Sequence, residues 1–356
     1  MTGWIWNAGA QETKPHMKLG AYYFAGWSGK CPYDDGKPEH AWAKGMPTHV
    51  TLKLTTDFAG RTPIWGWRDD TKELMERQIA LAAKNGISYF SFCWYWADNK
   101  GPINPAAIEK DSKHLPMQLF MQAKNNNLME FCLLVANHGG FEIIGPEAWK
   151  QAADYWIKNY FKHPRYLRVD GKPLVVIFSP KGGNAEGFAY LQEAARKAGF
   201  PGVEIACCGN GKPEDGYSVR TNYNVKPAGT AISEKHTYQE LIDANVKAWH
   251  STPGQPLIPV VTVGWDRRPW EAKDGQGFGN GVPVSWYFEK GTPAEFGNYM
   301  AKMATLMDKN PDLVTKDRLA LLYAWNEIGE GGWLVPCRDD PDGAYLKAIR
   351  EVVFGK

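Results

Sequence analysis

Short apolar or β-branched runs alternate with amphipathic segments about eight times along this 356-residue chain. Runs without a polar face are typical of strands buried on both sides of a parallel sheet. The strands predicted in this way span residues 18–24, 87–96, 129–137, 174–179, 203–208, 219–224, 257–265 and 319–325. Because eight strands, each followed by a covering helix, can close on themselves, the pattern predicts an α/β protein with a single-domain (β/α)8 TIM barrel.

The amphipathic segments between these runs predict the covering helices. A core-facing stripe with helical spacing runs from residue 74 and ends at Gly86, which suits a helix C-terminus. Thr292 and Pro293 give a helix-start signal, with a capping residue followed by proline in the first turn. The fifth crossover, around "GKPEDGYS", is too short for a full helix. The other helices are predicted near residues 115–127, 147–161, 186–199, 236–250, 293–309 and 342–353.

Long connections follow several of the predicted strands, at residues 25–67, 97–114 and 266–291. Strand-to-helix loops lie on the C-terminal face of a barrel, where active sites are built. No linker or low-complexity tract divides the chain. We therefore expect one catalytic domain over residues 18–356, preceded by a poorly structured leader over residues 1–17.

Charge and hydropathy narrow the class of function. Lysine plus arginine number 41 against 39 aspartate plus glutamate, and no basic patch could track a phosphate backbone, so no nucleic-acid partner is expected. No apolar stretch approaches the roughly 20 residues that span a bilayer, and the first residues do not resemble a secretory signal. We expect a soluble chain, periplasmic or secreted if an export signal was removed and otherwise cytoplasmic, with a monomer as the working assumption.

The six cysteines give no metal-site spacing, and no metal or cofactor is expected. Four lie in strand-like runs and are expected to be buried thiols: Cys93, Cys132, Cys207 and Cys208. Cys31 and Cys337 lie in loops after the first and last strands, which are neighbours once a barrel closes. They could form a disulfide or remain two free thiols.

Aromatic and polar side chains gather where the predicted strands end. Flat aromatic faces suit the apolar faces of sugar rings, and nearby polar groups can bind hydroxyls, so an oligosaccharide or polysaccharide is the expected ligand. The alternative is that the aromatic rings only plug the barrel end. The candidate substrate contacts are Tyr22, Tyr23, Trp27, Trp94, Tyr95, Trp96, Asp98, Asn137, His138, Trp265, Asp266, Trp325, Asn326 and Trp333. Loop lysines that could contact an acidic sugar, or could simply be solvated, are Lys100, Lys181 and Lys226.

Glu327 and Glu330 follow the last predicted strand in "YAWNEIGEGGWLVP". Glycoside cleavage commonly uses one carboxyl to protonate the leaving oxygen and a second as base or nucleophile, about 5–5.5 Å away in retaining enzymes. If the chain turns helically here, side chains three residues apart have β-carbons about 5–6 Å apart. A solvated turn is the alternative, but the place at the end of a barrel strand favours a catalytic pair. The glycines at 329, 331 and 332 suit either ligand approach or a tight turn.

These motifs resemble a known family. "YAWNEIGEGGWLVP" is similar to the Asn-Glu-x-x-Glu-Gly segment of glycoside hydrolase family 99. The segments "KLGAYYFAGW", "YFSFCWYWADNKG" and "YFKHPRYLRVDGKPLVVIFSP" extend the resemblance to family-99-like, or WbsX-like, proteins over most of the chain.

The resemblance implies an α/β barrel that cleaves α-linked sugars of manno configuration with retention and without a metal. It implies that Glu327 is a base, which deprotonates the 2-hydroxyl of the sugar, and that Glu330 is the general acid. For Glu330 to hold a proton near neutral pH, its pKa should be raised by burial or by the charge on Glu327. One of Tyr22 and Tyr23 would place a hydroxyl near the reacting carbon.

The chain also departs from the family pattern. Ile328 stands where tryptophan is usual, and "ANHGGFEIIG" replaces the polar segment expected after the third strand. The glycan contacts are therefore expected to differ from those of the family, and the substrate is either a mannoside-like or a rhamnoside-like glycan. The main alternative is a glycosyltransferase of polysaccharide assembly, a label that WbsX-like proteins often carry, although no Gly-rich phosphate loop is evident. A barrel that binds carbohydrate without cleaving it is the third possibility.

Overall fold

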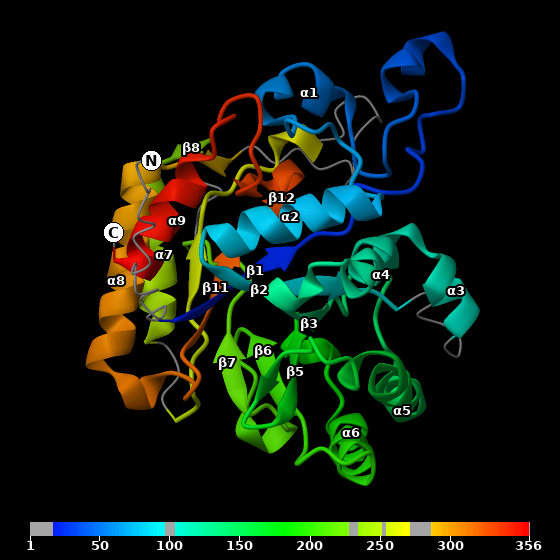
Figure 1. Ribbon diagram of the computed structural model, residues 1–356, viewed down its shortest axis with the longest axis vertical. Helices are drawn as coiled ribbons and strands as arrows, with labels where there is room; N and C mark the ends of the chain where they lie inside the picture. The colour runs from blue at the N-terminus through cyan, green and yellow to red at the C-terminus, as the bar shows by residue number, and fades with distance from the viewer. Residues whose placement is uncertain (1–16, 97–103, 228–233, 251–253, 271–285, 356) are drawn as a thin grey trace, which may run out of the picture.

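The centre of the molecule is a barrel of parallel strands. The computed structural model describes residues 17–96, 104–227, 234–250, 254–270 and 286–355. Within these residues eight strands run parallel in the order β7-β6-β5-β3-β2-β1-β11-β9, and Figure 1 shows helices outside them. They are β1 (Lys18–Tyr23), β2 (Ile87–Trp94), β3 (Glu130–Val135), β5 (Lys172–Ile177), β6 (Glu204–Cys208), β7 (Val219–Thr221), β9 (Val260–Thr262) and β11 (Leu319–Tyr323). The predicted (β/α)8 TIM barrel is confirmed.

The first and last of these strands lie side by side, because β1 pairs with β2 on one edge and with β11 on the other. The remaining seam, between β7 and the chain just before β9, is held by two backbone hydrogen bonds. Ile258 N donates to Arg220 O at 2.9 Å, and Arg220 N donates to Pro256 O at 3.0 Å. All eight carboxyl ends therefore open on one face of a nearly closed barrel.

The covering helices begin and end close to the predicted residues. Thr292 forms a full capping box with Glu295, and the chain leaves α2 through Gly86 at φ +88°, as their sequence signals predicted. Helices on the outer wall are α2 (Lys72–Lys84), α4 (Leu115–Gln122), α5 (Gly145–Trp156), α6 (Ala185–Lys197), α7 (Tyr238–Trp249), α8 (Pro293–Lys309) and α9 (Ala344–Phe354). The shorter α1 (Leu52–Thr55) and α3 (Pro105–Lys110) belong to the long loops after β1 and β2.

Smaller elements complete the loops. Between β6 and β7 the helical structure is a 3-10 turn over Pro213–Asp215, which confirms that this crossover is too short for a full helix. The remaining strands form short pairs: β4 (Arg168–Val169) with β5, β8 (Lys235–His236) with β10 (Tyr287–Phe288), and β12 (Asn326–Glu327) with β13 (Gly332–Trp333).

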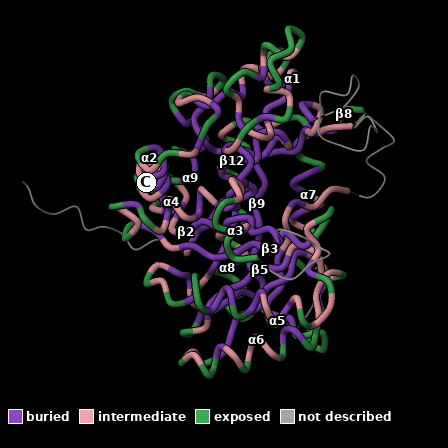
Figure 2. Tube along the Cα trace, turned by 90° about the vertical axis from the view of Figure 1, so that its right-hand side faces the viewer, coloured by how far each residue is buried: buried purple, intermediate pink, exposed green. Residues whose placement is uncertain are grey.

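Buried residues follow the barrel and the inner faces of the helices, as Figure 2 shows in purple. Every residue of β11 is buried, which explains why its sequence has no polar face. Of the helices in the described part of the chain, none is both long and apolar enough to cross a membrane. The predicted leader lies almost entirely outside the described residues.

The two loop cysteines are free thiols, so the disulfide alternative is not realised. The Cys31 thiol contacts the backbone oxygen of Val50 at 3.7 Å, whereas the Cys337 sulfur accepts a hydrogen bond from Trp333 Nε1 at 3.3 Å. The other four cysteines are buried, as predicted.

Candidate active site

Glu327 and Glu330 lie in one tight hairpin just beyond β11. Strands β12 and β13 pair antiparallel, with Glu327 opposite Gly332, and a 3-10 turn over Ile328–Glu330 joins them. Both carboxyls therefore belong to a single short loop, closed at its base by backbone pairing.

Asn326 fastens this hairpin to the first strand. Its side-chain Nδ2 donates to Phe24 O at 2.9 Å, while its Oδ1 accepts from Phe24 N at 2.7 Å. The backbone oxygen of Asn326 accepts a further bond from Trp27 Nε1 at 2.8 Å. Two residues predicted as substrate contacts, Asn326 and Trp27, thus position the glutamate loop.

The hairpin glycines are required by packing rather than by ligand approach. A β-carbon at Gly329 would lie 2.0 Å from the Trp270 ring. Gly331 has φ +86°, and a β-carbon there would lie 2.4 Å from the backbone nitrogen of Asp266. The tight-turn interpretation of these glycines therefore holds.

Glu327 is the more deeply buried of the two acids, with 3% of its surface exposed. Burial raises its pKa well above the ordinary value, and the charge of Glu330 raises it further, whereas Tyr223 and Arg267 act in the opposite direction. Within the described residues its Oε2 has no hydrogen-bond partner. Burial thus favours the protonated form of this carboxyl, and its Oε2 is available to form a hydrogen bond with a ligand.

Glu330 is half-buried and surrounded by groups that favour its ionised form. Tyr323 donates a hydrogen bond to its Oε2 at 2.8 Å, and Arg267 Nε lies 3.5 Å from its Oε1. Burial raises the pKa of Glu330, while Arg267, Tyr323 and Lys226 lower it. The expected rise in the pKa of Glu330 is thus present, but Glu327 is raised more strongly.

The two acids interact directly, since the charge of Glu330 raises the pKa of Glu327. Two neighbouring buried carboxyls cannot both ionise readily, so they titrate as a pair. Their coupling favours a state in which one of the two carboxyls is protonated and the other is ionised. One acid and one base in the same place are what general acid–base chemistry requires.

Trp265 forms a platform beside this pair. Its ring, 6% exposed, is stacked on Trp286 with centroids 6.4 Å apart and lies 6.2 Å from Tyr323. The Lys226 ammonium sits 3.7 Å from the Trp265 ring centroid. The Trp265 ring is thus covered by Trp286 and the Lys226 ammonium, which places a cation and a buried indole N–H beside the glutamate pair.

Two of the predicted tyrosines belong to the same region. Tyr22 packs 5.0 Å from Tyr223 and donates to the backbone oxygen of Asn222 at 2.7 Å. Burial raises the pKa of Tyr95, and the charges of Cys93 and Glu327 raise it further. Both rings therefore remain in the candidate site.

Three predicted contacts instead face the outer wall. Tyr23 donates to Asp69 Oδ2 at 3.0 Å, and Trp325 Nε1 donates to the Gln78 side chain on α2 at 2.6 Å. Trp94 packs 5.3 Å from Trp156 on α5. The three side chains contact the helices of the outer wall rather than the glutamates, so they lie outside the candidate site. Successive strand residues point to opposite faces, which is why the neighbours Tyr22 and Tyr23 separate in this way.

The polar candidates have mixed placements. Asp266 is buried and bound by two cations, Arg61 and Arg268, the latter with Nε 2.8 Å from Oδ1. Asn137 forms a two-way clamp with the Ser179 backbone, at 2.9 and 3.0 Å. Both therefore act within the protein.

The remaining candidates lie on the rim, in the interior or outside the described residues. His138 is exposed and packs 4.5 Å from Phe178, so it stays a rim candidate. Trp96 is buried beside Trp94, and Trp333 lies beneath the Lys290 ammonium at 3.4 Å. Asp98 and Lys100 fall outside the described residues.

Sequence reasoning missed Tyr223, Tyr323 and Arg267, the groups that contact or electrostatically influence the glutamates. Tyr323 lies in the last predicted strand, but the two-residue strand period does not single it out, because Trp325, two residues further on, contacts Gln78 on α2 while Tyr323 contacts Glu330. Arg267 follows the predicted Asp266 directly, but only the structure shows that Arg267 reaches Glu330.

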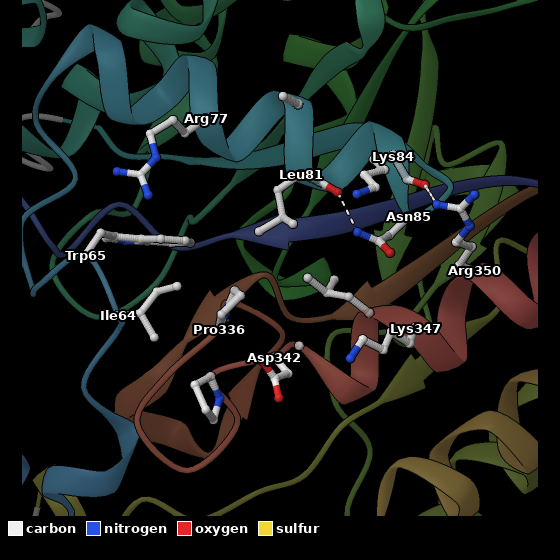
Figure 3. Close-up of a pocket in the computed structure, with 14 residues that line it drawn as sticks. Ile64, Trp65, Arg77, Leu81, Lys84, Asn85, Pro336, Asp342, Lys347 and Arg350 are labelled. Carbon is white, nitrogen blue, oxygen red and sulfur yellow. Dashed lines mark hydrogen bonds between the residues drawn. The ribbon is translucent and has the colours of Figure 1, made fainter.

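A pocket of about 620 Å³ lies elsewhere, on the outer wall between α2 and the chain entering α9. Figure 3 shows Trp65 and Ile64 at one end and Lys84 and Arg350 at the other. It includes neither glutamate, so the candidate site does not depend on it.

An Asp-x-Asp spacing, typical of metal-dependent glycosyltransferases, occurs at Asp340 and Asp342. Asp340 Oδ1 instead accepts a hydrogen bond from Ala344 N, at the start of α9, at 2.7 Å. Among the described residues, no group of three or more His, Cys, Asp or Glu side chains is arranged to hold a metal ion.

Comparison with known proteins assigns the family. The family model described as "Glycosyltransferase WbsX" matches residues 67–349. This chain belongs to the WbsX family. Among curated members of similar sequence, the protein WxcX of Xanthomonas campestris pv. campestris is 21% identical over 313 residues, and its function is uncharacterised. The match covers 80% of this chain but 41% of WxcX, so the chain spans about two fifths of the length of the curated relatives it matches.

Solved structures show which fold this WbsX chain shares. An endo-α-mannosidase of family GH99 from Bacteroides thetaiotaomicron superposes with a TM-score of 0.60 at 15% identity, covering 96% of this chain and 97% of that one. A glycoside hydrolase-like protein gives a TM-score of 0.59 at 14% identity, covering 99% and 97%. The WbsX chain therefore has the barrel fold of GH99 enzymes, as the resemblance implied.

Proposed function

We propose that the protein is a glycoside hydrolase that cleaves an α-linked glycan, mannoside- or rhamnoside-like, with retention, and that Glu327 and Glu330 are its catalytic residues. The observation that carries the proposal is the pair itself: two interacting buried carboxyls in one hairpin at the carboxyl end of the last barrel strand. The shared fold with a GH99 endo-α-mannosidase supports it.

The chemistry needs a proton donor at the glycosidic oxygen and, when the 2-hydroxyl of the sugar takes part, a proton acceptor at that hydroxyl. A carboxyl pair with one member protonated and one ionised can supply both. Tyr323 and Arg267 stabilise the carboxylate form of Glu330, and burial stabilises the protonated form of Glu327. In the unliganded site these surroundings therefore favour the ionised form of Glu330 and the protonated form of Glu327.

This resting distribution is opposite to the roles that the family resemblance implies, in which Glu327 is the base and Glu330 the acid. A substrate hydroxyl bound at Glu327, and displacement of Arg267 from Glu330 by the incoming glycan, would reverse it. Retention through the sugar's own 2-hydroxyl requires this reversal, so the roles can be tested separately from the pair.

The test compares Glu327→Gln and Glu330→Gln on two α-glycosides of the same sugar, found by screening α-mannosides, α-rhamnosides and complex polysaccharides. One has a phenol leaving group that departs without protonation, and the other has an alkyl leaving group. If Glu330 is the acid, its variant loses about 10²–10⁴-fold in kcat on the alkyl glycoside and far less on the phenyl glycoside. Glu327→Gln should then be impaired on both. Wild-type activity of either variant on both substrates would end the hydrolase proposal.

A glycosyltransferase is the second candidate, favoured by the description of the matching family. It predicts that nucleotide sugars, and not free oligosaccharides, raise the melting temperature of the protein. A barrel that only binds carbohydrate is the third candidate. It predicts that an oligosaccharide binds tightly and is recovered intact after prolonged incubation.

A further inference from the structure

We propose that the substrate carries an anionic sugar residue, bearing a carboxylate, next to the cleaved bond, and that Lys226, Arg267 and Trp265 bind this residue. The inference rests on the proposed function and specifies its substrate class. It begins from hydrogen-bond donors around Glu330 that have no acceptor.

Three donors share this position. Trp265 Nε1 is buried and has no acceptor among the described residues. The same holds for Arg267 Nε as a hydrogen-bond donor, although it lies 3.5 Å from Glu330. The Lys226 ammonium contacts the Trp265 ring, and no described residue accepts a hydrogen bond from it or pairs with it. Trp265 Nε1 and Arg267 Nε are buried atoms, whereas Lys226 is partly exposed. Buried donors are normally satisfied, so a ligand that brings acceptors is the simplest partner for this group.

The charge of the cluster points to an anion. Lys226 and Arg267 bring two positive charges beside two coupled carboxyls whose pKa values are both raised, which disfavours full ionisation of the pair. Asp266 does not change this balance, because its carboxylate is already bound by Arg61 and Arg268. Burial lowers the pKa of Lys226, the charge of Glu330 raises it, and the neighbouring charge of Arg267 lowers it again, so that the pKa is lowered on balance.

The Trp265 indole N–H favours a sugar as the carrier of that anion. It can donate to a sugar hydroxyl while the neighbouring Lys226 ammonium pairs with the carboxylate of the same residue. A neutral glycan would cover the two cations without pairing them. The arrangement therefore selects against neutral substrates as well as for acidic ones.

The experiment measures binding by calorimetry in the Glu327→Gln background, which keeps the size of the buried protonated side chain and slows turnover. The probes are oligosaccharides of glucuronic, galacturonic and mannuronic acid, each with its carboxyl-reduced neutral counterpart. We expect at least one acidic probe to bind about 10- to 100-fold more tightly than its reduced form, the range for a hydrogen bond to a charged group. Adding Lys226→Met should abolish this preference, and Lys226→Arg should retain most of it.

Lys212→Met provides the matched control. Lys212 is an exposed lysine in the loop after β6, paired with Glu214, and its loss should leave the preference unchanged. Melting curves of each variant establish that it is folded.

The inference is overturned if no acidic probe binds more tightly than its reduced counterpart, or if nucleotide sugars bind and no acidic probe shows the preference. It is also overturned if neutral and acidic substrates are cleaved with equal kcat/KM, a result that leaves the hydrolase proposal standing. Acid-selective binding with full activity of Glu330→Gln would instead reject the catalytic pair and keep the anion site.

Discussion

The phenol of Tyr323 donates a 2.8 Å hydrogen bond to Oε2 of Glu330, from the last residue of β11 to the hairpin that follows it. Because a hydrogen bond to the ionised form lowers a carboxyl pKa, this contact sets the pH at which the pair first loses a proton. It also fixes the orientation of the carboxyl.

Replacing Tyr323 by phenylalanine should therefore raise the pKa of Glu330. We expect the acidic limb of the kcat/KM profile to move to higher pH, and kcat/KM at the optimum to fall about 10- to 100-fold, as for loss of a hydrogen bond to a charged group. A pH–rate profile on the cleaved substrate measures both. Tyr190→Phe is the control, because Tyr190 makes a similar bond to Asp154 on the surface. An unshifted limb would remove Tyr323 from the site.

Glu327→Gln should stabilise the protein at neutral and alkaline pH. Its folded pKa lies above the unfolded value of about 4.3, so this side chain supports folding most at low pH and loses that contribution as pH rises above about 4.3. Glutamine does not titrate. The melting temperature of the variant should exceed that of the wild type by more at pH 7.5 than at pH 4.5. For Glu214→Gln, at an exposed position, the difference in melting temperature from the wild type should be the same at both pH values. Equal gains at both pH values for Glu327→Gln would contradict the raised pKa of Glu327.

Asp266→Ala should destabilise the fold. The change leaves Arg61 buried without its carboxylate, and removing one partner of a buried ion pair costs about 3–5 kcal/mol. Denaturant unfolding measures this loss. The exposed pair of Glu193 and Lys197 gives the control, since Glu193→Ala removes a solvent-screened charge and should cost far less. A small effect at Asp266 would indicate that its carboxylate is available for ligand.

Gly331→Ala should impair activity through the position of Glu330. The new β-carbon would meet the backbone nitrogen of Asp266, which now donates to Glu330 O at 2.7 Å. Displacement of a catalytic group by about 1 Å can cost about 10²-fold, so we expect a loss of that order in kcat/KM. Gly199→Ala is the control for backbone strain without a steric clash, because Gly199 has φ +94° but open space where the β-carbon would lie. Equal effects at the two sites would contradict this account.

The barrel was predictable because its signals are local. Uninterrupted apolar runs mark strands buried on both faces, and Thr292 and Gly86 mark helix ends through backbone geometry that depends on a few neighbours. The position of the glutamate pair followed from the same strand count. These features need no knowledge of distant contacts.

The surroundings of the pair were less predictable because they depend on orientation and on long-range contacts. Tyr22 and Tyr23 are adjacent and chemically alike, yet they face opposite sides of the strand. The sequence alone did not show which of the two faces the candidate site. Asp266 looked like a ligand contact because its partner Arg61 lies 205 positions away, in the long loop after β1. Cys31 and Cys337 were plausible neighbours, but their thiols have different partners.

The hairpin that carries both acids has a mechanical consequence. Its ends are joined by the pairing of β12 with β13, so the separation of the two carboxyls is set within eight consecutive residues, 326–333. A movement at the seam between β7 and β9 would shift Tyr223 and Lys226, which follow β7, and would leave that separation unchanged. Substrate fit and acid–base spacing can thus vary independently, which allows one reactive unit to be retained while the glycan it accepts diverges.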